Sequence, residues 1–326
     1  MNTDQPQLIS IVVPAFNEEA VLPQFHQTIA LVLSELPFVF ELVYINDGSS
    51  DNTLSIIKQL RESDKQVTLI DLSRNFGKEI ALSAGLQKAA GDAVIVIDAD
   101  LQDPPELIPE LIREWQNGYD VVYAQRTHRK GESLLKRTTA HFFYRIIQRI
   151  SKIAIPEDTG DFRILSRRAV NALNTFNEQH RFMKGLFAWI GYRQKAVHYQ
   201  RDPRHAGETK WNYWKLWNFA LDGITSFTIA PLKISTYLGL ITAAGAFAYG
   251  IYMVIETLIY GNPVAGYPSL IVIILILGGV QLVAIGILGE YLGRIFNETK
   301  RRPLYFINEY IPSSEADARR PASEHE

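Results

Sequence analysis

The chain has 326 residues, a formal net charge of −2 and no cysteine, and 47% of its residues are hydrophobic. This length allows one full α/β domain and an additional segment. The lack of cysteine excludes disulfides, thiolate catalysis and cysteine-ligated metal sites, and the near-neutral charge argues against a general nucleic-acid-binding surface. The apolar run near the N-terminus is short, ends at Pro14 and lacks a basic start, so we expect no signal peptide.

Residues 8 to about 125 alternate between short apolar runs and helical segments, which is typical of βαβ units. We expect strands at 8–13, 40–45, 67–72, 93–97 and 121–124, and helices at 20–35, 52–63, 78–90 and 105–117. The expected fold class is α/β, with a mostly parallel, doubly wound sheet. The chain has no G-x-G-x-x-G motif after the first strand and no G-x-x-x-x-G-K-[ST] motif, which argues against a dinucleotide fold and a P-loop enzyme.

The expected strand at 93–97 is followed directly by two carboxylates one residue apart, Asp98 and Asp100. Ligands of open α/β sheets bind at the carboxyl ends of strands, and residues two apart in an extended chain share a face. Two carboxylates on one face repel each other unless a cation lies between them, and hard oxygen ligands suit Mg²⁺ or Mn²⁺. The pair therefore predicts a metal-dependent enzyme acting on a nucleotide-linked substrate. The alternative is a surface turn with solvated acids.

Polar motifs also follow the first two expected strands. Asn17, Glu18 and Glu19 come after the first, and the run Asn46-Asp47-Gly48-Ser49 comes after the second. At this edge of the sheet, Glu18 and Asp47 could accept hydrogen bonds from a nucleobase or a ribose. Each motif alone could also be turn and helix-cap chemistry, but three in order at one edge are more specific.

Residues 126–152 contain eight Lys or Arg residues and a single acid, Glu132, with apolar residues at helical spacing. This pattern predicts a basic amphipathic helix near 133–153, which suits an anionic membrane surface or a phosphate-bearing lipid. The alternative is an ordinary surface helix packed on the sheet.

The C-terminal third is strongly apolar, and Glu256 is the only charged residue between Lys233 and Glu290. Two apolar stretches, about 234–258 and 267–290, are each long enough to cross a hydrocarbon core of ~30 Å. They predict a transmembrane hairpin within residues 232–293; two buried helices of a soluble core are the alternative. Basic residues flank both ends of the hairpin but not its connecting loop, which predicts a multi-pass protein with both termini cytoplasmic.

The domain boundaries follow from these segments. We expect a cytoplasmic catalytic domain at 1–209 and an interfacial helix, rich in tryptophan, at 210–231. A cytoplasmic C-terminal arm is expected at 294–326, and its end, from Ser313 to Glu326, is expected to be a polar, disordered tail.

Several motifs together resemble glycosyltransferase family 2 enzymes with the GT-A fold. The matching runs are V-P-A-F-N-E-E (13–19), N-D-G-S (46–49), S-R-N-F-G-K-E (73–79), D-A-D-L-Q-D-P-P-E (98–106), G-D-F-R (160–163) and G-E-T-K-W (207–211). The chain is most similar to the polyprenyl-phosphate glycosyltransferases, in particular the bactoprenol glucosyltransferase branch, which is related to dolichyl-phosphate mannose synthase. The run R-F-M-K-G-L-F-A-W-I-G-Y (181–192) supports this placement. Asn46 departs from the Asp-Asp-Gly-Ser common in the broader family, which weakens the comparison at that position only.

The resemblance implies roles for individual residues. Donor binding is implied for Pro14, Phe16, Glu18, Asp47, Lys78 and Asp98. Metal and diphosphate binding is implied for Asp98, Asp100 and Gln102. Lipid-phosphate binding is implied for Arg126, Arg129 and Arg163. Asp161 and Asp100 are the implied catalytic residues.

The implied reaction is an inverting transfer of glucose from UDP-glucose to undecaprenyl phosphate, with Mg²⁺ or Mn²⁺, at the cytoplasmic face of the inner (plasma) membrane. The implied partners are a nucleotide sugar, a polyprenyl phosphate lipid and the membrane, without nucleic acid; small residues in the spans favour a homo-oligomer only weakly. A phosphate monoester loses its second proton near pH ~6, so the acceptor arrives ionised and Asp161 is expected to position or stabilise charge rather than act as a strong base. The alternatives are a processive polysaccharide synthase, although no Q-x-x-R-W motif is present, and a membrane scaffold with an inactive transferase domain.

Overall fold

The computed structural model describes residues 7–127, 156, 159–179, 181–199, 230–261 and 266–319. The chain divides into two units, and each is described by itself. The first contains Met1–Gln148, Lys152–Asn212 and Arg302–Glu326, and the second contains Arg149–Ser151 and Tyr213–Arg301. The basic helix expected near 133–153 and almost all of the interfacial helix expected at 210–231 lie outside the described residues.

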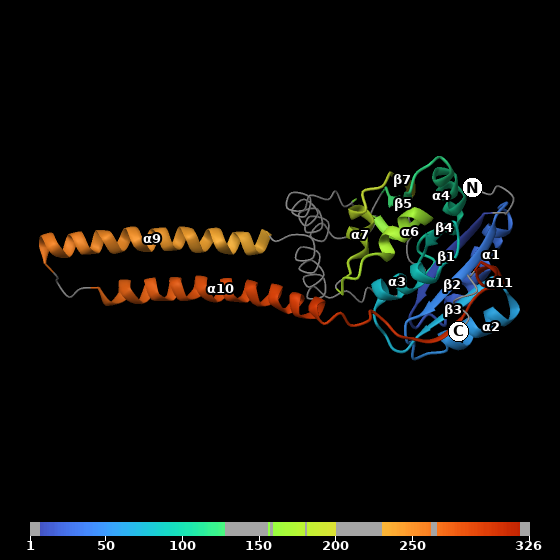
Figure 1. Ribbon diagram of the computed structural model, residues 1–326, viewed down its shortest axis with the longest axis horizontal. Coiled ribbons are helices and arrows are strands. Elements are labelled where there is room, and N and C mark those ends of the chain that lie inside the picture. Colours follow the sequence, from blue (N-terminus) through green and yellow to red (C-terminus); the bar gives the residue numbers. More distant parts are fainter. Residues whose placement is uncertain are drawn as a thin grey trace. The chain divides into compact units, whose positions relative to one another are not determined.

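The first unit is built on a sheet whose described strands have the order β7-β5-β6-β4-β1-β2-β3-β8 (Figure 1). These strands are β1 (Leu8–Ala15), β2 (Val39–Asn46), β3 (Val67–Leu72), β4 (Ala93–Val96), β5 (Val121–Arg126), β6 (Thr159–Ser166), β7 (Gln194–Tyr199) and β8 (Ile307–Ile311). Strands β4, β1, β2 and β3 are parallel neighbours, as are β5 and β7. Strand β6 is antiparallel to β4 and β5, and β8 is antiparallel to β3. The expected mostly parallel α/β sheet is therefore confirmed.

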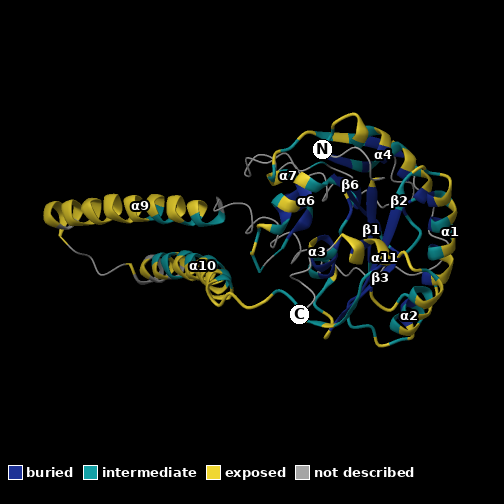
Figure 2. Ribbon diagram, turned by 45° about the vertical axis from the view of Figure 1, so that its right-hand side comes forward, coloured by how far each residue is buried: buried dark blue, intermediate teal, exposed yellow. Residues whose placement is uncertain are grey.

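Helices cover both faces of this sheet. The described helices of the unit are α1 (Leu22–Ser34), α2 (Thr53–Ser63), α3 (Lys78–Lys88), a short 3₁₀ turn (Pro105–Leu107), α4 (Ile108–Gln116), α6 (Arg167–Asn174), α7 (Met183–Trp189) and α11 (Ser314–Ala318). Phe25 of α1, Ile57 of α2 and Leu111 of α4 pack in one apolar cluster with alternate residues of β1. Helix α3 packs on the other face, where a Cβ on Gly85 would lie only 2.5 Å from Val12 and 2.7 Å from Ile45. Because both faces are covered, the central strands are buried apolar runs (Figure 2).

Residues 307–311 return to the sheet, and the tail expected to be disordered from Ser313 onward begins with a helix. Strand β8 adds to the edge of β3, and the fully buried Ser313 begins α11. The Ser313 hydroxyl donates to Glu41 Oε2 at 3.2 Å and accepts a hydrogen bond from the backbone N–H of Ala316 at 3.1 Å. Composition predicts disorder from Ser313 onward because the segment is polar, but the residues just before it pair with an otherwise open strand edge and the Ser313 cap satisfies a buried carboxylate.

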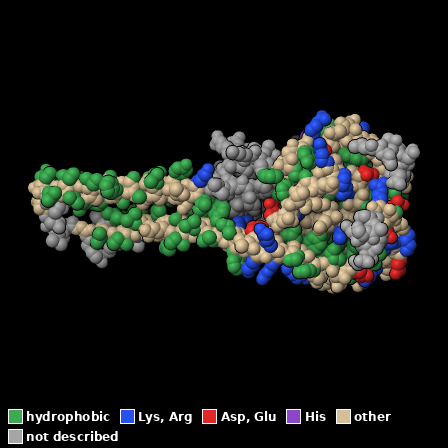
Figure 3. Space-filling model, viewed as in Figure 1, with side chains coloured by type: hydrophobic (Ala, Val, Ile, Leu, Met, Phe, Trp, Pro, Cys, Tyr) green, Lys and Arg blue, Asp and Glu red, His purple; other side chains and the backbone are tan. Residues whose placement is uncertain are grey.

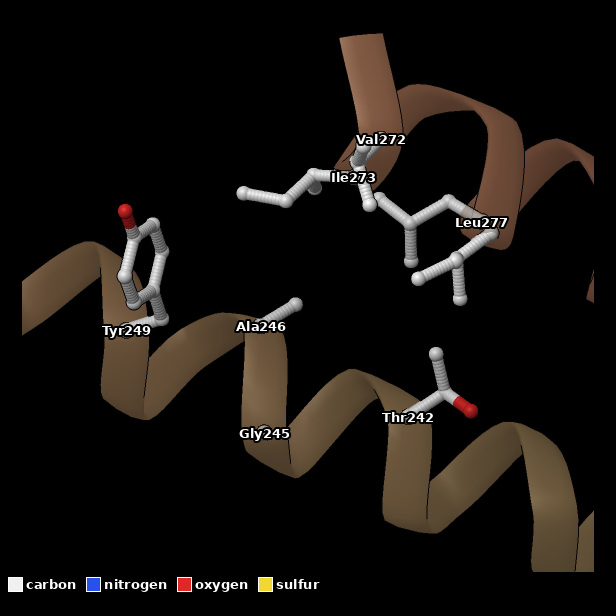
Figure 4. Close-up of a pocket in the computed structure, with 8 residues that line it drawn as sticks. Thr242, Gly245, Ala246, Tyr249, Val272, Ile273 and Leu277 are labelled. Atoms are coloured by element: carbon white, nitrogen blue, oxygen red, sulfur yellow. The ribbon is translucent and has the colours of Figure 1, made fainter. Parts of the chain in front are cut away.

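The second unit contains two long helices, α9 (Ala230–Tyr260) and α10 (Tyr267–Thr299), which pack against each other. Both are long and apolar enough to cross a membrane, and many of their side chains are exposed hydrophobic residues (Figure 3). An apolar cavity lies between the helices, with Gly245, Ala246 and Tyr249 on α9 facing Ile273 and its neighbours on α10 (Figure 4). The apolar stretches expected at 234–258 and 267–290 thus form helices, and α10 continues past its expected end to Thr299.

Candidate functional site

A cavity of about 300 Å³ lies where the carboxyl ends of β1, β2 and β4 meet the N-terminus of α3. Its lining residues are Pro14, Ala15, Phe16, Glu18, Asp47, Asn75, Gly77, Lys78, Ala81, Asp98, Ala99 and Asp100. The structure therefore brings together all six residues for which the sequence implies donor binding, and adds Asp100. The cause is topological, since parallel strands end at the same edge of the sheet and the loops that follow them converge there.

Lys78, the first residue of α3, links two carboxylates at this cavity. Its Nζ lies 2.7 Å from a carboxylate oxygen of Asp98 and 2.5 Å from Oδ2 of Asp161, which is on β6. Burial alone would lower the pKa of the Lys78 ammonium, but Asp161 and Asp98 raise it above its usual range. Lys78 is therefore a permanent cation between two carboxylates that are distant in sequence.

The two carboxylates differ in their electrostatic surroundings. Burial would raise the pKa of Asp161, but Lys78, Lys184 and Arg163 hold it below its usual range, so Asp161 stays ionised. Burial raises the pKa of Asp98, against the opposing effect of Lys78. The Oδ1 atom of Asp161 is buried and accepts no hydrogen bond from any described residue. Asp161 does not line the cavity, but beside the Lys78 ammonium, which does, it carries a charged oxygen without a hydrogen-bond donor among the described residues.

Two neighbours of Asp161 received no role from the sequence. Glu79 follows Lys78 on α3, and its Oε2 accepts a hydrogen bond from the backbone N–H of Met183 at 3.0 Å, which ties α3 to α7. Lys184 on α7 lowers the pKa of Asp161. Both residues stand in runs that carry the family resemblance, 73–79 and 181–192, and this was the signal that could have identified them.

Arg163 lies inside the protein rather than at a surface that a lipid phosphate could reach. The residue is only 4% exposed, and its guanidinium carbon lies 3.8 Å from the centroid of the Phe187 ring. Its nitrogen atoms donate to the backbone carbonyls of Gly160 at 2.8 Å and Asp161 at 3.2 Å. The implied role of Arg163 in lipid-phosphate binding is therefore not supported. The sequence identifies Arg163 as a charged residue of a family motif, but the structure buries it on β6, where its guanidinium donates to the backbone around Asp161.

Asp47 lines the cavity but uses both carboxylate oxygens within the protein. They accept hydrogen bonds from the backbone N–H groups of Phe76 at 2.8 Å and Gly77 at 2.9 Å. Gly48, with φ +65°, allows this close approach, because a Cβ there would lie 2.4 Å from the backbone carbon of Arg74. Asp47 thus holds the turn that leads into Lys78, in addition to forming part of the cavity wall.

Asp100 lines the cavity and has few contacts with described residues that could compete with a metal ion. The described residues contain no group of three His, Cys, Asp or Glu side chains that could hold a metal by themselves. Asp98 is occupied by Lys78, while Asp100 accepts only the backbone N–H of Gln102, at 3.1 Å, from a described residue. The Gln102 side chain does not line the cavity. These donors fit a divalent ion that takes most of its ligands from substrate phosphates and water, as Mg²⁺ commonly does.

Arg126, the last residue of β5, is held beside this site without lining the cavity. Its Nε donates to the Tyr199 hydroxyl at 3.1 Å, and its Nη2 lies 3.5 Å from Asp103 Oδ1. Gly160, which precedes Asp161, lies against it, since a Cβ on Gly160 would be 3.3 Å from Arg126 Nη2. Arg129, the remaining residue implied for the lipid phosphate, lies outside the described residues.

Two parts of the chain match known protein families. Residues 10–173 match the model of glycosyl transferase family 2, and residues 230–295 match that of the GtrB C-terminal hairpin. An uncharacterized glycosyltransferase from Synechocystis sp. is 53% identical over 93% of this chain and 97% of its own length. The bactoprenol glucosyl transferase of Shigella phage SfV is 53% identical over 92% of this chain and 97% of its own length. The prophage bactoprenol glucosyl transferase homolog of Escherichia coli K12 is 52% identical over 92% and 98%.

Among solved structures, glucosyl-3-phosphoglycerate synthase from Mycobacterium tuberculosis is similar over 68% of this chain and 78% of its own, with 20% identity and a TM-score of 0.47. The family assignment rests on the sequence matches, which cover both the site and the two apolar helices. The apolar hairpin also indicates membrane association. The chain belongs to glycosyl transferase family 2 and carries a GtrB-type C-terminal hairpin.

Proposed function

We propose that this enzyme transfers glucose, with inversion, from UDP-glucose to a polyprenyl phosphate such as undecaprenyl phosphate. The observation that carries the proposal is the 52–53% identity, over 92% of the chain, to proteins named bactoprenol glucosyl transferases. The product is a lipid-phosphate-linked sugar for cell-envelope glycosylation.

The donor is assigned to the cavity at the carboxyl edge of the sheet. Phe16 is 45% exposed at its wall and offers an aromatic face to a nucleobase. Lys78 brings a permanent cation to the same cavity, where a diphosphate would compete with Asp98 and Asp161 for its ammonium. Base, phosphates and sugar are thereby oriented along the strand ends.

A divalent cation, Mg²⁺ or Mn²⁺, would be held by Asp100, with Asp98 beside it, and would supply Lewis-acid stabilisation of the charge on the departing diphosphate. Asp100 contributes a hard anionic ligand from a turn in which the next residue, Leu101, has φ +54°. The left-handed conformation of Leu101 turns the chain directly after Asp100, whose carboxylate accepts the backbone N–H of Gln102.

The acceptor's chemistry sets the role proposed for Asp161. A lipid phosphate is largely ionised at neutral pH and needs no base to attack C1 of the sugar. Asp161 is itself ionised, and its buried Oδ1 lacks a hydrogen-bond donor among the described residues. We assign Asp161 to accept a hydrogen bond from a sugar hydroxyl and to stabilise the positive charge that develops at C1.

The apolar hairpin supports a reaction at a membrane. We propose that α9 and α10 both span the inner membrane, that the catalytic domain and both termini are cytoplasmic, and that residues 133–153 and 210–231 lie at the interface. Basic residues before and after the hairpin, and none in its connecting loop, support this orientation. A soluble sugar donor and a lipid acceptor can then meet at one site.

The proposal is tested with the purified full-length protein, Mg²⁺ or Mn²⁺, undecaprenyl phosphate and a panel of nucleotide sugars, with the lipid product identified by mass spectrometry. We expect one glucose per lipid phosphate from UDP-glucose, with an α-to-β change of configuration at C1. Repeated chain growth on one lipid would favour a processive synthase. Absence of turnover with every donor would favour a scaffold with an inactive domain.

A further inference from the structure

Three side chains form a directional hydrogen-bonded chain at the end of β5 and β7. Arg126 Nε donates to the Tyr199 hydroxyl at 3.1 Å, and that hydroxyl donates its proton to Asp103 Oδ1 at 2.5 Å. Arg126 Nη2 lies 3.5 Å from the same Asp103 oxygen. Burial and Asp103 raise the pKa of Tyr199 to about 12, so its hydroxyl keeps the proton that it donates.

The buried carboxylate of Asp103 is compensated by this arrangement. Asp103 is 3% exposed, and a buried carboxylate is costly unless hydrogen bonds and a cation compensate it. Tyr199 and Arg126 supply both. The Arg126 side chain is 25% exposed, and no described residue accepts a hydrogen bond from its Nη1. One edge of the guanidinium is therefore held by the protein, and Nη1 has no acceptor among the described residues.

The backbone fixes the position of Arg126 as well. Thr127 donates both its backbone N–H, at 3.0 Å, and its hydroxyl, at 3.1 Å, to the carbonyl oxygen of Tyr199. The guanidinium rests against Gly160, where a Cβ would lie 3.3 Å from Arg126 Nη2 and 3.4 Å from Asp103 Oδ2. The held cation is thus adjacent to the backbone that carries Asp161.

We propose that Tyr199 and Asp103 are positioning residues that hold the Arg126 guanidinium in place for the phosphate of the lipid acceptor. This inference rests on the proposed function, because it assigns the acceptor end of the same reaction. A guanidinium binds phosphate best when its planar fork is already oriented, and the Tyr199 and Asp103 contacts restrict the rotation of that fork. Neither residue needs to touch the substrate.

The test is Tyr199→Phe, which removes one hydroxyl and leaves every charge in place. We expect the KM for undecaprenyl phosphate to rise about tenfold, the effect of losing one hydrogen bond to a charged group, while the KM for the nucleotide sugar is unchanged. Binding of undecaprenyl phosphate in nanodiscs without donor should weaken by the same factor. Tyr192→Phe is the matched control, because its ring packs against Arg168 instead, and it should match wild type.

A double-mutant cycle separates positioning from general destabilisation. In an Arg126→Ala background, Tyr199→Phe should have no further effect on lipid KM, because a residue acting through Arg126 has nothing left to position. Additive effects, an equal rise in donor KM, or a wild-type lipid KM in Tyr199→Phe would each overturn the inference. If the wild-type protein binds the lipid phosphate but transfers no sugar to it, the proposed function fails, while the binding difference still decides the role of Tyr199.

Discussion

Lys78 and Asp161 are 83 residues apart in the sequence, yet Lys78 Nζ lies 2.5 Å from Asp161 Oδ2. Lys78 opens α3 and Asp161 lies on β6, so the pair joins the start of that helix to this strand. Because Lys78 also binds Asp98, one ammonium compensates two carboxylates. Lys78 thus supplies, from within the protein itself, the positive charge that compensates these two carboxylates.

Replacing Lys78 with Met should reduce turnover at least about 10²-fold, because it leaves Asp98 and Asp161 without their shared cation and removes a positive charge from the diphosphate site. Steady-state kinetics of purified protein measures this. Lys88→Met at the other end of α3 is the control and should keep full turnover, since Lys88 lies 5.4 Å from the Tyr310 ring and outside the cavity. A wild-type kcat in Lys78→Met would contradict the assignment.

Asp100→Ala should lose at least about 10²-fold in turnover and should no longer respond to added Mg²⁺ or Mn²⁺. The reason is that Asp100 lines the cavity and, from the described residues, accepts only the backbone N–H of Gln102. A chelator should produce a similar loss in the wild-type protein. Glu110→Ala, which removes a surface acid paired with Arg113, is the control. Full activity of the wild type in chelator would remove the metal from the mechanism.

Asp161→Asn should lower kcat roughly 10²-fold, and this factor should be the same at every pH between 6 and 8. Lys78, Lys184 and Arg163 hold the pKa of Asp161 low against the effect of burial, so its protonation falls in acid, below this range. The measurement is a pH–kcat profile of both proteins. A steep loss of wild-type activity near neutral pH that disappears in Asp161→Asn would instead indicate a general base.

Glu79 should make the protein less stable as the pH rises from about 4.5 to about 7. Burial and the nearby Asp161 raise its pKa from 4.5 to about 7 in the folded protein. The folded state then holds the proton more tightly than the unfolded chain, so the stabilisation is complete below the unfolded pKa and is lost as the pH rises through the folded one. Thermal unfolding across this range should show the slope, and Glu79→Gln should reduce it. An equal slope in both proteins would exclude Glu79 as its source.

Ser313→Ala should lower the free energy of unfolding of the catalytic domain by about 1–2 kcal/mol. The substitution removes the cap of α11 and a hydrogen bond to the buried Glu41 carboxylate. Denaturant unfolding measures the change. Ser34→Ala, which loses only an exposed bond to the Leu31 carbonyl, should have almost no effect. A similarly small change in Ser313→Ala would show that the C-terminal segment does not stabilise the domain.

Much of the molecule could be predicted from local patterns. The apolar runs that became β1 to β4 and the polar residues that follow them place the cavity, because parallel strands end at one edge. The two apolar stretches became α9 and α10 because their length and composition leave few other structures. Family membership followed from motifs of four to twelve residues, each short enough to be recognised in the chain itself.

Only the tertiary structure decided which charges meet. The sequence predicted a cation between Asp98 and Asp100, whereas Lys78 joins Asp98 to Asp161 and leaves Asp100 open. It implied that Arg163 binds the lipid phosphate, but Arg163 is buried and donates to a backbone carbonyl. It assigned Ser313 to a disordered tail, but Ser313 caps a helix and binds Glu41, 272 residues away. Residue chemistry and periodicity are properties of short segments, while burial and the choice of partner depend on contacts between segments that only folding brings together.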